Sequence, residues 1–305
     1  ADSAAYQATQ FTQQPNFGAE NSVSPTRVQP QVALMARWPF MRDSGAWGQQ
    51  VIEPIAQVIV APNAGQSQFT KIPNEDSLDL EFTDQNLFAL NRFAGIDRQE
   101  GGVRASGWLH TAWLLNGFAY DGLIGQSYRT EKTTLFEQQA GLWNSVSDVV
   151  ARATVSPTKW LDLTYRTRLD HASLHTQAAD GLASVGTNDF RVTAGYLYSR
   201  FNPYTFYDQA PPPPPGNAYF KPRNEVTLGV SAGYGRYKFN TAVRENVQLK
   251  RLDSIGAVVS YEDECSIFDV RLFQRYTSIN GDHGATTVLF EITFKTVGQV
   301  GFRAL

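Results

Sequence analysis

An alternation of apolar and polar residues with a period of two runs through most of this chain and limits what it can fold into. In a β-strand, successive side chains point to opposite faces, so this period produces one apolar face and one polar face. The clearest segment runs from Arg223 to Tyr234. One face carries the apolar residues Val226, Leu228, Val230, Ala232 and Tyr234. The other face carries the small or polar residues Glu225, Thr227, Gly229, Ser231 and Gly233. Helical spacing is nearly absent, so the sequence predicts an all-β chain.

About thirteen such strands can be drawn between stretches rich in turn residues, most of them about ten to thirteen residues long. The best-defined segments lie at 28–38, 51–60, 161–169, 190–198, 223–234, 255–261, 268–272 and 286–296. The weakest lies at 172–182, where Asp180 and Gly181 interrupt a poor alternation. Pro54 lies within one segment and is expected to weaken pairing locally, because proline has no backbone N–H to donate.

The length of these segments favours a membrane barrel over a soluble fold. Strands of sandwiches and small soluble barrels average about five or six residues and carry polar side chains on the outside. Strands of a transmembrane barrel need roughly 9–11 residues, with apolar residues facing lipid, polar residues facing the lumen and aromatic girdles at both interfaces. We therefore expect a transmembrane antiparallel β-barrel. Aromatic residues near the segment ends fit the girdles, although aromatics favour strands in any setting: Trp38, Tyr128, Tyr165, Tyr198, Tyr234, Tyr261, Tyr276 and Phe294.

The composition excludes several functional classes. Only 18% of the residues are charged, against about 25% in typical proteins, while 12% are aromatic. The net charge of −3 and the lack of a Lys/Arg run leave no basic surface for nucleic acid, so no nucleic-acid partner is expected. One cysteine supports neither an internal disulfide nor a CxxC zinc site. No apolar stretch is long enough for a transmembrane helix, and the chain begins without Met or an apolar signal core.

The connections predict which strand ends face outward, because outer-membrane barrels alternate short periplasmic turns with longer outer loops. If the C-terminus lies in the periplasm, short turns at 116–117, 156–158 and 235–236 fall inside. A long structured loop at 61–102 and a proline-rich loop at 202–222 then fall outside. An odd strand count leaves the N-terminus outside and two sheet edges unpaired in lipid, which is costly. The chain is therefore expected to form the C-terminal part of a larger barrel.

Two regions resemble a known family. The sequence from Ile72 reads IPNEDSLDLEFTDQNLFALNRFAGIDRQEGGVRASG, and VVSYEDECSIFDVRLFQRYT and TTVLFEITFKTVG lie near the end. These segments resemble the LPS-assembly protein LptD, also called organic solvent tolerance protein, in the form found in alphaproteobacteria. The first block is the most specific, and a weaker likeness extends from about Val28 to Gly298. The motif residues in the predicted loop are Pro73, Asn74, Glu75, Asp76, Ser77, Asn91, Arg92, Gly95, Asp97, Arg98, Gly101 and Gly102.

The resemblance implies a very large outer-membrane barrel that inserts lipopolysaccharide into the outer leaflet. It also implies partners: a plug lipoprotein of the LptE type in the lumen, a periplasmic bridge of the LptA type that reaches an N-terminal jellyroll outside this chain, and the lipids of the outer membrane.

Cys265 acquires an interpretation from the same resemblance. Family members often carry two adjacent cysteines in this C-terminal turn, bonded to cysteines near the N-terminal domain, whereas Ser266 follows Cys265 here. The resemblance thus implies one disulfide to a Cys outside this chain, with a free thiol as the alternative. The strand order independently places Cys265 on the periplasmic side, which is an oxidising compartment.

Two charged sets are candidates for function. Carboxylates at Glu75, Asp76, Asp79, Glu81 and Asp84 could hold a hard divalent cation. Their spacing fits no EF-hand, so a solvated loop, or one paired with Arg92, Arg98 and Arg104, is the favoured interpretation. A second set is expected to face the lumen, where it could pair across strands, hydrate a path for saccharide, or do both: Asp162, Arg166, Arg168, Arg191, Glu225, Arg244, Asp269, Arg271 and Arg275.

Motifs for catalysis are weak. Residues 229–233 match GxSxG, but a nucleophile elbow needs a helix after the strand and turn, and Ser231 lies inside the clearest alternating segment. His110, His171, His175 and His283 show no metal or triad spacing, and there is neither a P-loop nor a GxGxxG motif. The leading hypothesis is a non-enzymatic lipopolysaccharide translocon without a cofactor. A general outer-membrane porin or receptor-type channel, and a barrel enzyme such as a lipase or protease, remain alternatives.

Overall fold

The structure is a computed structural model that describes most of the chain. The described residues are 2–3, 6–7, 22–23, 26–63, 81–93, 95–132, 136, 140–200, 223–248, 250–276, 284–295 and 298–303. The chain divides into two compact units: unit 1 contains residues 1–113, 121–152 and 167–176, and unit 2 contains residues 114–120, 153–166 and 177–305. Within the described residues, no helix is long and apolar enough to cross a membrane.

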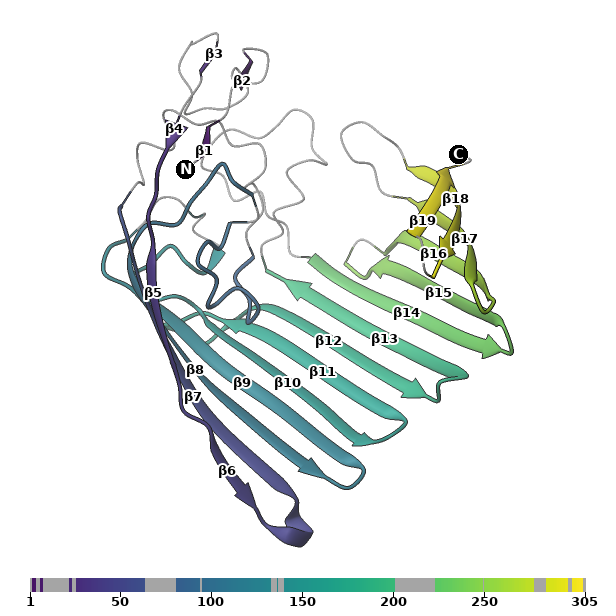
Figure 1. Ribbon diagram of the computed structural model, residues 1–305, viewed down its shortest axis with the longest axis horizontal. Helices are drawn as coiled ribbons and strands as arrows, with labels where there is room; N and C mark the ends of the chain where they lie inside the picture. The colour runs from purple at the N-terminus through teal and green to yellow at the C-terminus, as the bar shows by residue number, and fades with distance from the viewer. Residues whose placement is uncertain are drawn as a thin grey trace. The chain divides into compact units, whose positions relative to one another are not determined.

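One antiparallel sheet contains fifteen of the described strands (Figure 1). Each strand from the third onward pairs with the next one along the chain, and the first two both pair with the third. The strands are β5 (Val32–Arg37), β6 (Phe40–Asp43), β7 (Gln49–Ala61), β8 (Gly102–Leu115), β9 (Phe118–Arg129), β10 (Val149–Thr158), β11 (Leu161–Leu169), β12 (Thr176–Gly186), β13 (Phe190–Ser199), β14 (Arg223–Tyr234), β15 (Tyr237–Asn246), β16 (Arg251–Glu262), β17 (Ser266–Arg275), β18 (Ala285–Phe294) and β19 (Gly298–Arg303). The predicted all-β antiparallel class is confirmed.

Shorter elements lie near the N-terminus. Two separate ladders join β1 (Asp2–Ser3) to β4 (Thr26–Arg27) and β2 (Tyr6–Gln7) to β3 (Ser22–Val23). A single 3-10 turn, η1 (Gly45–Trp47), connects β6 to β7.

The strand expected at 28–38 is interrupted opposite Pro54. β5 pairs with residues 55–60 of β7, and β6 pairs with residues 49–52, so both share one partner. Between them, the backbone N–H of Trp38 donates to the carbonyl of Pro54 at 3.1 Å. The ladder is thus disturbed at the proline, as its missing N–H predicts.

Three other boundaries differ from the expectation. β19 follows the strand that was predicted to be last, and its GQVGFR sequence is too short and glycine-rich to show alternation. β12 begins at Thr176 instead of residue 172, because the Asp170 carboxylate accepts hydrogen bonds from the N–H groups of Ala172 and Ser173 and closes a turn there. The turn predicted at 156–158 lies at 159–160, since β10 continues to Thr158.

The two faces of the sheet differ in unit 2 as the alternation predicts. Cross-strand partners share a face, so Val192 opposite Val230 and Val270 opposite Phe290 belong to one apolar surface. Large side chains on this surface are exposed, among them Phe190, Val192, Tyr196, Leu228, Phe239, Val259, Phe268, Val270, Leu272, Phe290 and Phe294. A contiguous exposed apolar surface of this kind marks an interaction site for a membrane or a protein, and the length of the strands matches the expectation of a lipid-facing surface.

Aromatic rings gather where the apolar face approaches the short turns of β15–β17. The rings of Tyr237 and Tyr261 lie 5.2 Å apart between centroids, and those of Tyr261 and Phe268 lie 6.3 Å apart. Aromatic rings with a polar edge are favoured at the boundary between lipid and water.

Unit 1 contains a hydrophobic core that is built by connecting segments. It joins Phe82, Leu87 and Phe93 of the connection between β7 and β8 to Phe136, Ala140 and Leu142 of the connection between β9 and β10 and to Val150 of β10. Val150 lies in phase with Arg152, which pairs with Asp121 on the polar face, so this core covers the polar face of the sheet.

Candidate functional site

A buried ion cluster anchors the connection between β7 and β8. Glu100 is fully buried, and its carboxylate lies 3.3 Å from the guanidinium of Arg92 and 3.3 Å from that of Arg104. Arg129, at the end of β9, also pairs with Glu100. One negative charge is thus surrounded by three positive charges in a region closed to water, where electrostatic interactions are strong. Removal of the carboxylate would leave three cations without their shared partner.

Arg92 also fastens the connection to two strands of the sheet. One guanidinium nitrogen donates to the hydroxyl of Ser127 at 2.7 Å, the hydroxyl of Ser106 at 3.3 Å and the carbonyl of Leu87 at 3.1 Å. The guanidinium carbon lies 5.4 Å from the centre of the Phe82 ring. Burial lowers the pKa of Arg92 to about 10, and the attraction of Glu100 acts in the opposite direction. Arg92 is therefore still a cation at neutral pH.

Other motif residues shape the backbone of the same segment. The Asn91 amide donates to the carbonyl of Arg98 at 3.1 Å, and its oxygen accepts from the N–H of Glu100 at 3.1 Å. Asp97 and Arg98 are buried. Gly102 has φ +86, a conformation that side chains disfavour. Gly95 and Gly101 lie in the same described segment, whereas Pro73, Asn74, Glu75, Asp76 and Ser77 lie outside the described residues.

The predicted acidic cluster is only partly described. Asp84 is buried and lies 3.4 Å from Arg152 of β10, which is not among the arginines named from the sequence. Glu81 is exposed, and Glu75, Asp76 and Asp79 lie outside the described residues. The structure therefore shows a pairing for Asp84 that links the connection to the sheet.

A second group of possible metal ligands lies elsewhere in unit 1. Asp148, Asp170 and His171 offer ligand atoms within 4.8 Å of one another. The Arg168 guanidinium, however, lies 3.0 Å from a carboxylate oxygen of Asp148, and both side chains are buried. Asp148 is thus already paired with a buried cation, so the group is described as an ion-pair cluster. Arg168, predicted to face the lumen, is part of it.

An unbroken series of ion pairs and hydrogen bonds crosses the polar face of unit 1. Arg37 of β5 pairs with Glu53 of β7 at 2.9 Å, and both nitrogens of His110 on β8 contact carboxylates. The Nδ1 atom of His110 lies 3.3 Å from the carboxylate of Glu53, and its Nε2 atom lies 2.7 Å from the carboxylate of Asp121 on β9. Arg152 of β10 then pairs with Asp121 at 2.9 Å. His110 thus lies between two carboxylates on the polar face of the sheet, where both of its ring nitrogens have partners.

The polar face of unit 2 carries the remaining predicted lumen residues. Asp162 pairs with Arg191 at 2.7 Å, and Arg166 lies 3.9 Å from Asp180. The other predicted residues share this face because cross-strand partners point to the same side of a sheet. One continuous row of partners across β13–β18 is Arg191, Ser231, Asn240, Val258, Arg271 and Leu289.

Most of these charges have partners. Glu225 pairs with Arg223 and lies 3.8 Å from Arg244, and Arg271 lies 3.0 Å from both Asp269 and Glu291. Arg275 lies opposite Ser254 on the same face. The structure thus shows the cross-strand pairing that was one of the two interpretations of these residues.

Several residues of the site escaped the sequence analysis. Glu100 lies within the quoted motif but was not selected, and Arg129 and Glu291 were not considered. Arg129 lies in phase with Asp121 and Ser127 on β9, so the alternation alone could have assigned it to the polar face. Its pairing with Glu100, however, spans 29 residues and depends on the path of the connection.

Cys265 lies in the short turn between β16 and β17 and is an exposed free thiol. Its carbonyl accepts from the N–H of Lys295 at 3.0 Å, which joins this turn to the end of β18. The neighbouring Glu262 carboxylate lies 2.6 Å from Lys238 and 2.9 Å from Lys295, so the turn sits among paired charges. Its thiol is open to a partner from outside.

Comparison with solved structures finds variants of a porin from Rhodopseudomonas blastica. One variant has a TM-score of 0.44 and 9% identity over 94% of this chain and 87% of that chain. Another has a TM-score of 0.42 and 9% identity over 99% of this chain and 94% of that chain. Among curated proteins, none matches the chain.

The family model LptD, described as LPS transport system D, matches residues 1–231. The chain belongs to the LptD family. LptD is an outer-membrane β-barrel that inserts lipopolysaccharide and performs no enzymatic reaction. This assignment places the chain in the outer membrane and decides between the translocon and the alternatives of a porin or a barrel enzyme. The predicted resemblance to the LptD family is thus confirmed.

Proposed function

We propose that this LptD chain guides the saccharide portion of lipopolysaccharide along the polar face of its sheet while its apolar face contacts lipid. The observation that carries this proposal is the separation of the two faces in β13–β18. Exposed Val192, Leu228 and Phe290 lie on one face, and charged and hydroxyl side chains such as Arg191, Ser231 and Arg271 lie on the other. An amphiphile needs a wet path for its sugars and an apolar one for its acyl chains, because burial of either in the wrong medium is costly.

The segment 81–101 is proposed to belong to an outer loop that folds onto the polar face and narrows this path. Its support is the buried core around Leu87 and the Glu100 ion cluster. Both hold the segment against β8 and β9, where Arg92 reaches Ser106 and Ser127. The proline-rich segment 202–222 is proposed as a second outer loop and lies outside the described residues.

The partners proposed for this chain are a plug lipoprotein of the LptE type and a periplasmic bridge of the LptA type, together with lipopolysaccharide and outer-membrane lipids. Support comes from family membership, because transport of lipopolysaccharide to the outer membrane needs delivery from the periplasm. Cys265 is proposed to form a disulfide with a Cys outside this chain. Its exposed thiol in a turn at the proposed periplasmic end supports this assignment.

A depletion strain tests the proposal. Cells that lose their own LptD while expressing the full protein should keep lipopolysaccharide on the surface, measured by labelling of intact cells. Arg271→Glu should reduce surface lipopolysaccharide, because it places a third negative charge beside Asp269 and Glu291. Leu272→Ala, the neighbouring residue on the apolar face, serves as the control. Restoration of small-solute conductance without surface lipopolysaccharide would support a porin and contradict the proposal.

A further inference from the structure

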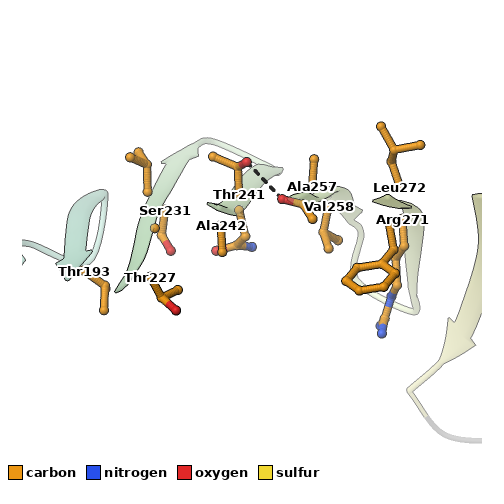
Figure 2. A pocket seen from close by; sticks show the side chains of 14 residues that line it. Thr193, Thr227, Ser231, Thr241, Ala242, Ala257, Val258, Arg271 and Leu272 are labelled. Carbon is orange, nitrogen blue, oxygen red and sulfur yellow. Dashed lines mark hydrogen bonds between the residues drawn. The ribbon is translucent and has the colours of Figure 1, made fainter. Parts of the chain in front are cut away.

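A hollow of about 490 Å³ lies on the sheet of unit 2, between β13 and β17. This volume is within the range of about 300–1,000 Å³ for small-molecule sites. In Figure 2, Thr193, Thr227, Ser231, Ala242 and Arg271 point to one side of the sheet, and Ala257 and Leu272 point to the other. The first side is the polar face, since Ser231 lies opposite Arg191 in the register of β13 and β14.

The floor of the hollow is made by the smallest residues. Thr193 lies opposite Gly229, Gly229 opposite Ala242, Ala242 opposite Gly256, and Gly256 opposite Phe273. This row crosses five strands with almost no side-chain volume in its middle. A Cβ at Gly256 would meet only the Phe273 ring, at 3.7 Å, which is an ordinary contact. The space at Gly256 is therefore open, and a larger side chain at this position could occupy it without a clash.

Polar groups without a partner surround this floor. Within the described part of the chain, the side chains of Thr227, Ser231 and Asn240 make no hydrogen bond. Ser231 and Asn240 are also exposed and lie opposite each other on β14 and β15. Most other polar side chains on this face are engaged, as Arg191 is with Asp162 and Ser184. Hydroxyl and amide groups that point into one hollow can donate to and accept from a ligand at once.

An aromatic side chain closes one end of the row. Phe273 is 47% exposed on the polar face, where most neighbouring side chains are small or polar. Beside it, Arg271 is held by Asp269 and Glu291 but is still 45% exposed. A flat apolar ring beside hydrogen-bonding groups and a positioned guanidinium is suited to a sugar, because the C–H face of a pyranose stacks on an aromatic ring.

We propose that this hollow is a saccharide-binding subsite, in which Phe273 stacks on a sugar ring and Thr227, Ser231 and Asn240 bind its hydroxyl groups. Arg271, which is held between Asp269 and Glu291, donates to hydroxyl groups of the sugar from the edge. The proposal rests on the proposed function and names where on the polar face the sugar portion pauses. A protein occupant is less well suited, because the core of a protein interface is rich in large aromatic side chains, whereas the small residues Gly229, Ala242 and Gly256 form the centre here.

Two neighbouring residues of β16 provide a matched test. Gly256→Val fills the hollow from its floor, whereas Ala257→Val adds the same side chain type on the lipid-facing side of the same strand. Valine is well tolerated in strands, so neither change should prevent folding. Asn240→Ala and Phe273→Ala remove one hydrogen-bonding group and the ring without adding volume. Heat-dependent gel mobility of each variant checks that the barrel has formed.

The probe is the core oligosaccharide released from lipopolysaccharide by mild acid, with lipid A as the comparison. Binding to the full protein in detergent is measured by isothermal titration calorimetry. We expect Gly256→Val, Asn240→Ala and Phe273→Ala to weaken oligosaccharide binding about tenfold, with less than about a twofold effect of Ala257→Val and no change for lipid A. Equal effects of the two valine variants would overturn the subsite.

A photocrosslinking residue in place of Asn240 gives a second readout in cells. Crosslinks to lipopolysaccharide from this position, and none from Val243 on the opposite face of the strand, are expected. Crosslinks to a protein alone would overturn the subsite in favour of a protein-covered surface. If the wild-type protein handles lipopolysaccharide but does not bind the oligosaccharide, the subsite is wrong and the proposed function stands. If lipopolysaccharide never associates with the protein, the proposed function itself fails.

Discussion

The carboxylate of Glu100 lies 3.3 Å from the guanidinium of Arg92, and neither side chain reaches water. Because Arg92 also binds hydroxyl groups of β8 and β9, this pair connects the segment 81–101 to the sheet. The segment 81–101 is therefore coupled to strands β8 and β9 through the buried carboxylate of Glu100.

Glu100→Gln should release this segment. Loss of the charge leaves Arg92, Arg104 and Arg129 buried without their shared partner, which should destabilise the folded segment by about 3–5 kcal/mol. Trypsin cleaves after arginine, so new cleavage at Arg92 or Arg98 in intact cells measures the release. Glu264→Gln, an exposed residue in a short turn, is the control and should leave protection unchanged. Continued resistance of the Glu100 variant would contradict the proposed role of the cluster.

Two glycines on adjacent strands should respond differently to alanine. A Cβ at Gly125 of β9 would lie 2.5 Å from Leu87 and 2.8 Å from the carbonyl of Gly107, whereas a Cβ at Gly107 of β8 meets nothing within 4 Å. Gly125→Ala should therefore cost about 1–3 kcal/mol through overpacking, and Gly107→Ala should cost much less. The midpoint of heat-dependent gel mobility measures the difference. Similar midpoints for both variants would show that Leu87 does not pack against Gly125.

Two carboxylates in neighbouring connections have pKa values that are shifted in opposite directions. Burial raises the pKa of Asp148, although Arg168 lowers it, while hydrogen bonds from Ser173 lower the pKa of Asp170. The contribution of Asp148 to stability is therefore present at low pH and lost as pH rises through its folded pKa. That of Asp170 is present above its unfolded pKa and lost as pH falls. Titration followed by carboxyl ¹³C NMR should give a higher pKa for Asp148 than for Asp170. The reverse order would show that Asp148 is not buried as described.

Cys265→Ser tests the proposed disulfide. The exposed thiol is expected to bond to a Cys outside this chain in the oxidising periplasm, so the full-length protein should change mobility on a non-reducing gel when Cys265 is replaced. Ser266→Ala, at the next position, is the control. Identical migration of wild type and Cys265→Ser without reductant would remove the disulfide from the proposal.

The division of residues between two faces could be predicted from the sequence for most of the sheet. Arg191, Glu225, Asp269 and Arg271 lie on the polar face as expected, and the register of β13–β18 aligns them. The strand at 172–182 was misplaced because the hydrogen bonds of Asp170 close a turn before Thr176, and side-chain bonding to the backbone leaves little trace in hydropathy.

The sequence by itself determined which side chains of a strand share a face, because a period of two is a local property of extended backbone. Only the tertiary structure decided that Glu100 meets Arg129 and that Gly229 and Gly256 lie in one row that ends at Phe273. Those relationships depend on strand register and on the route of long connections, which are set by contacts between residues far apart in the chain.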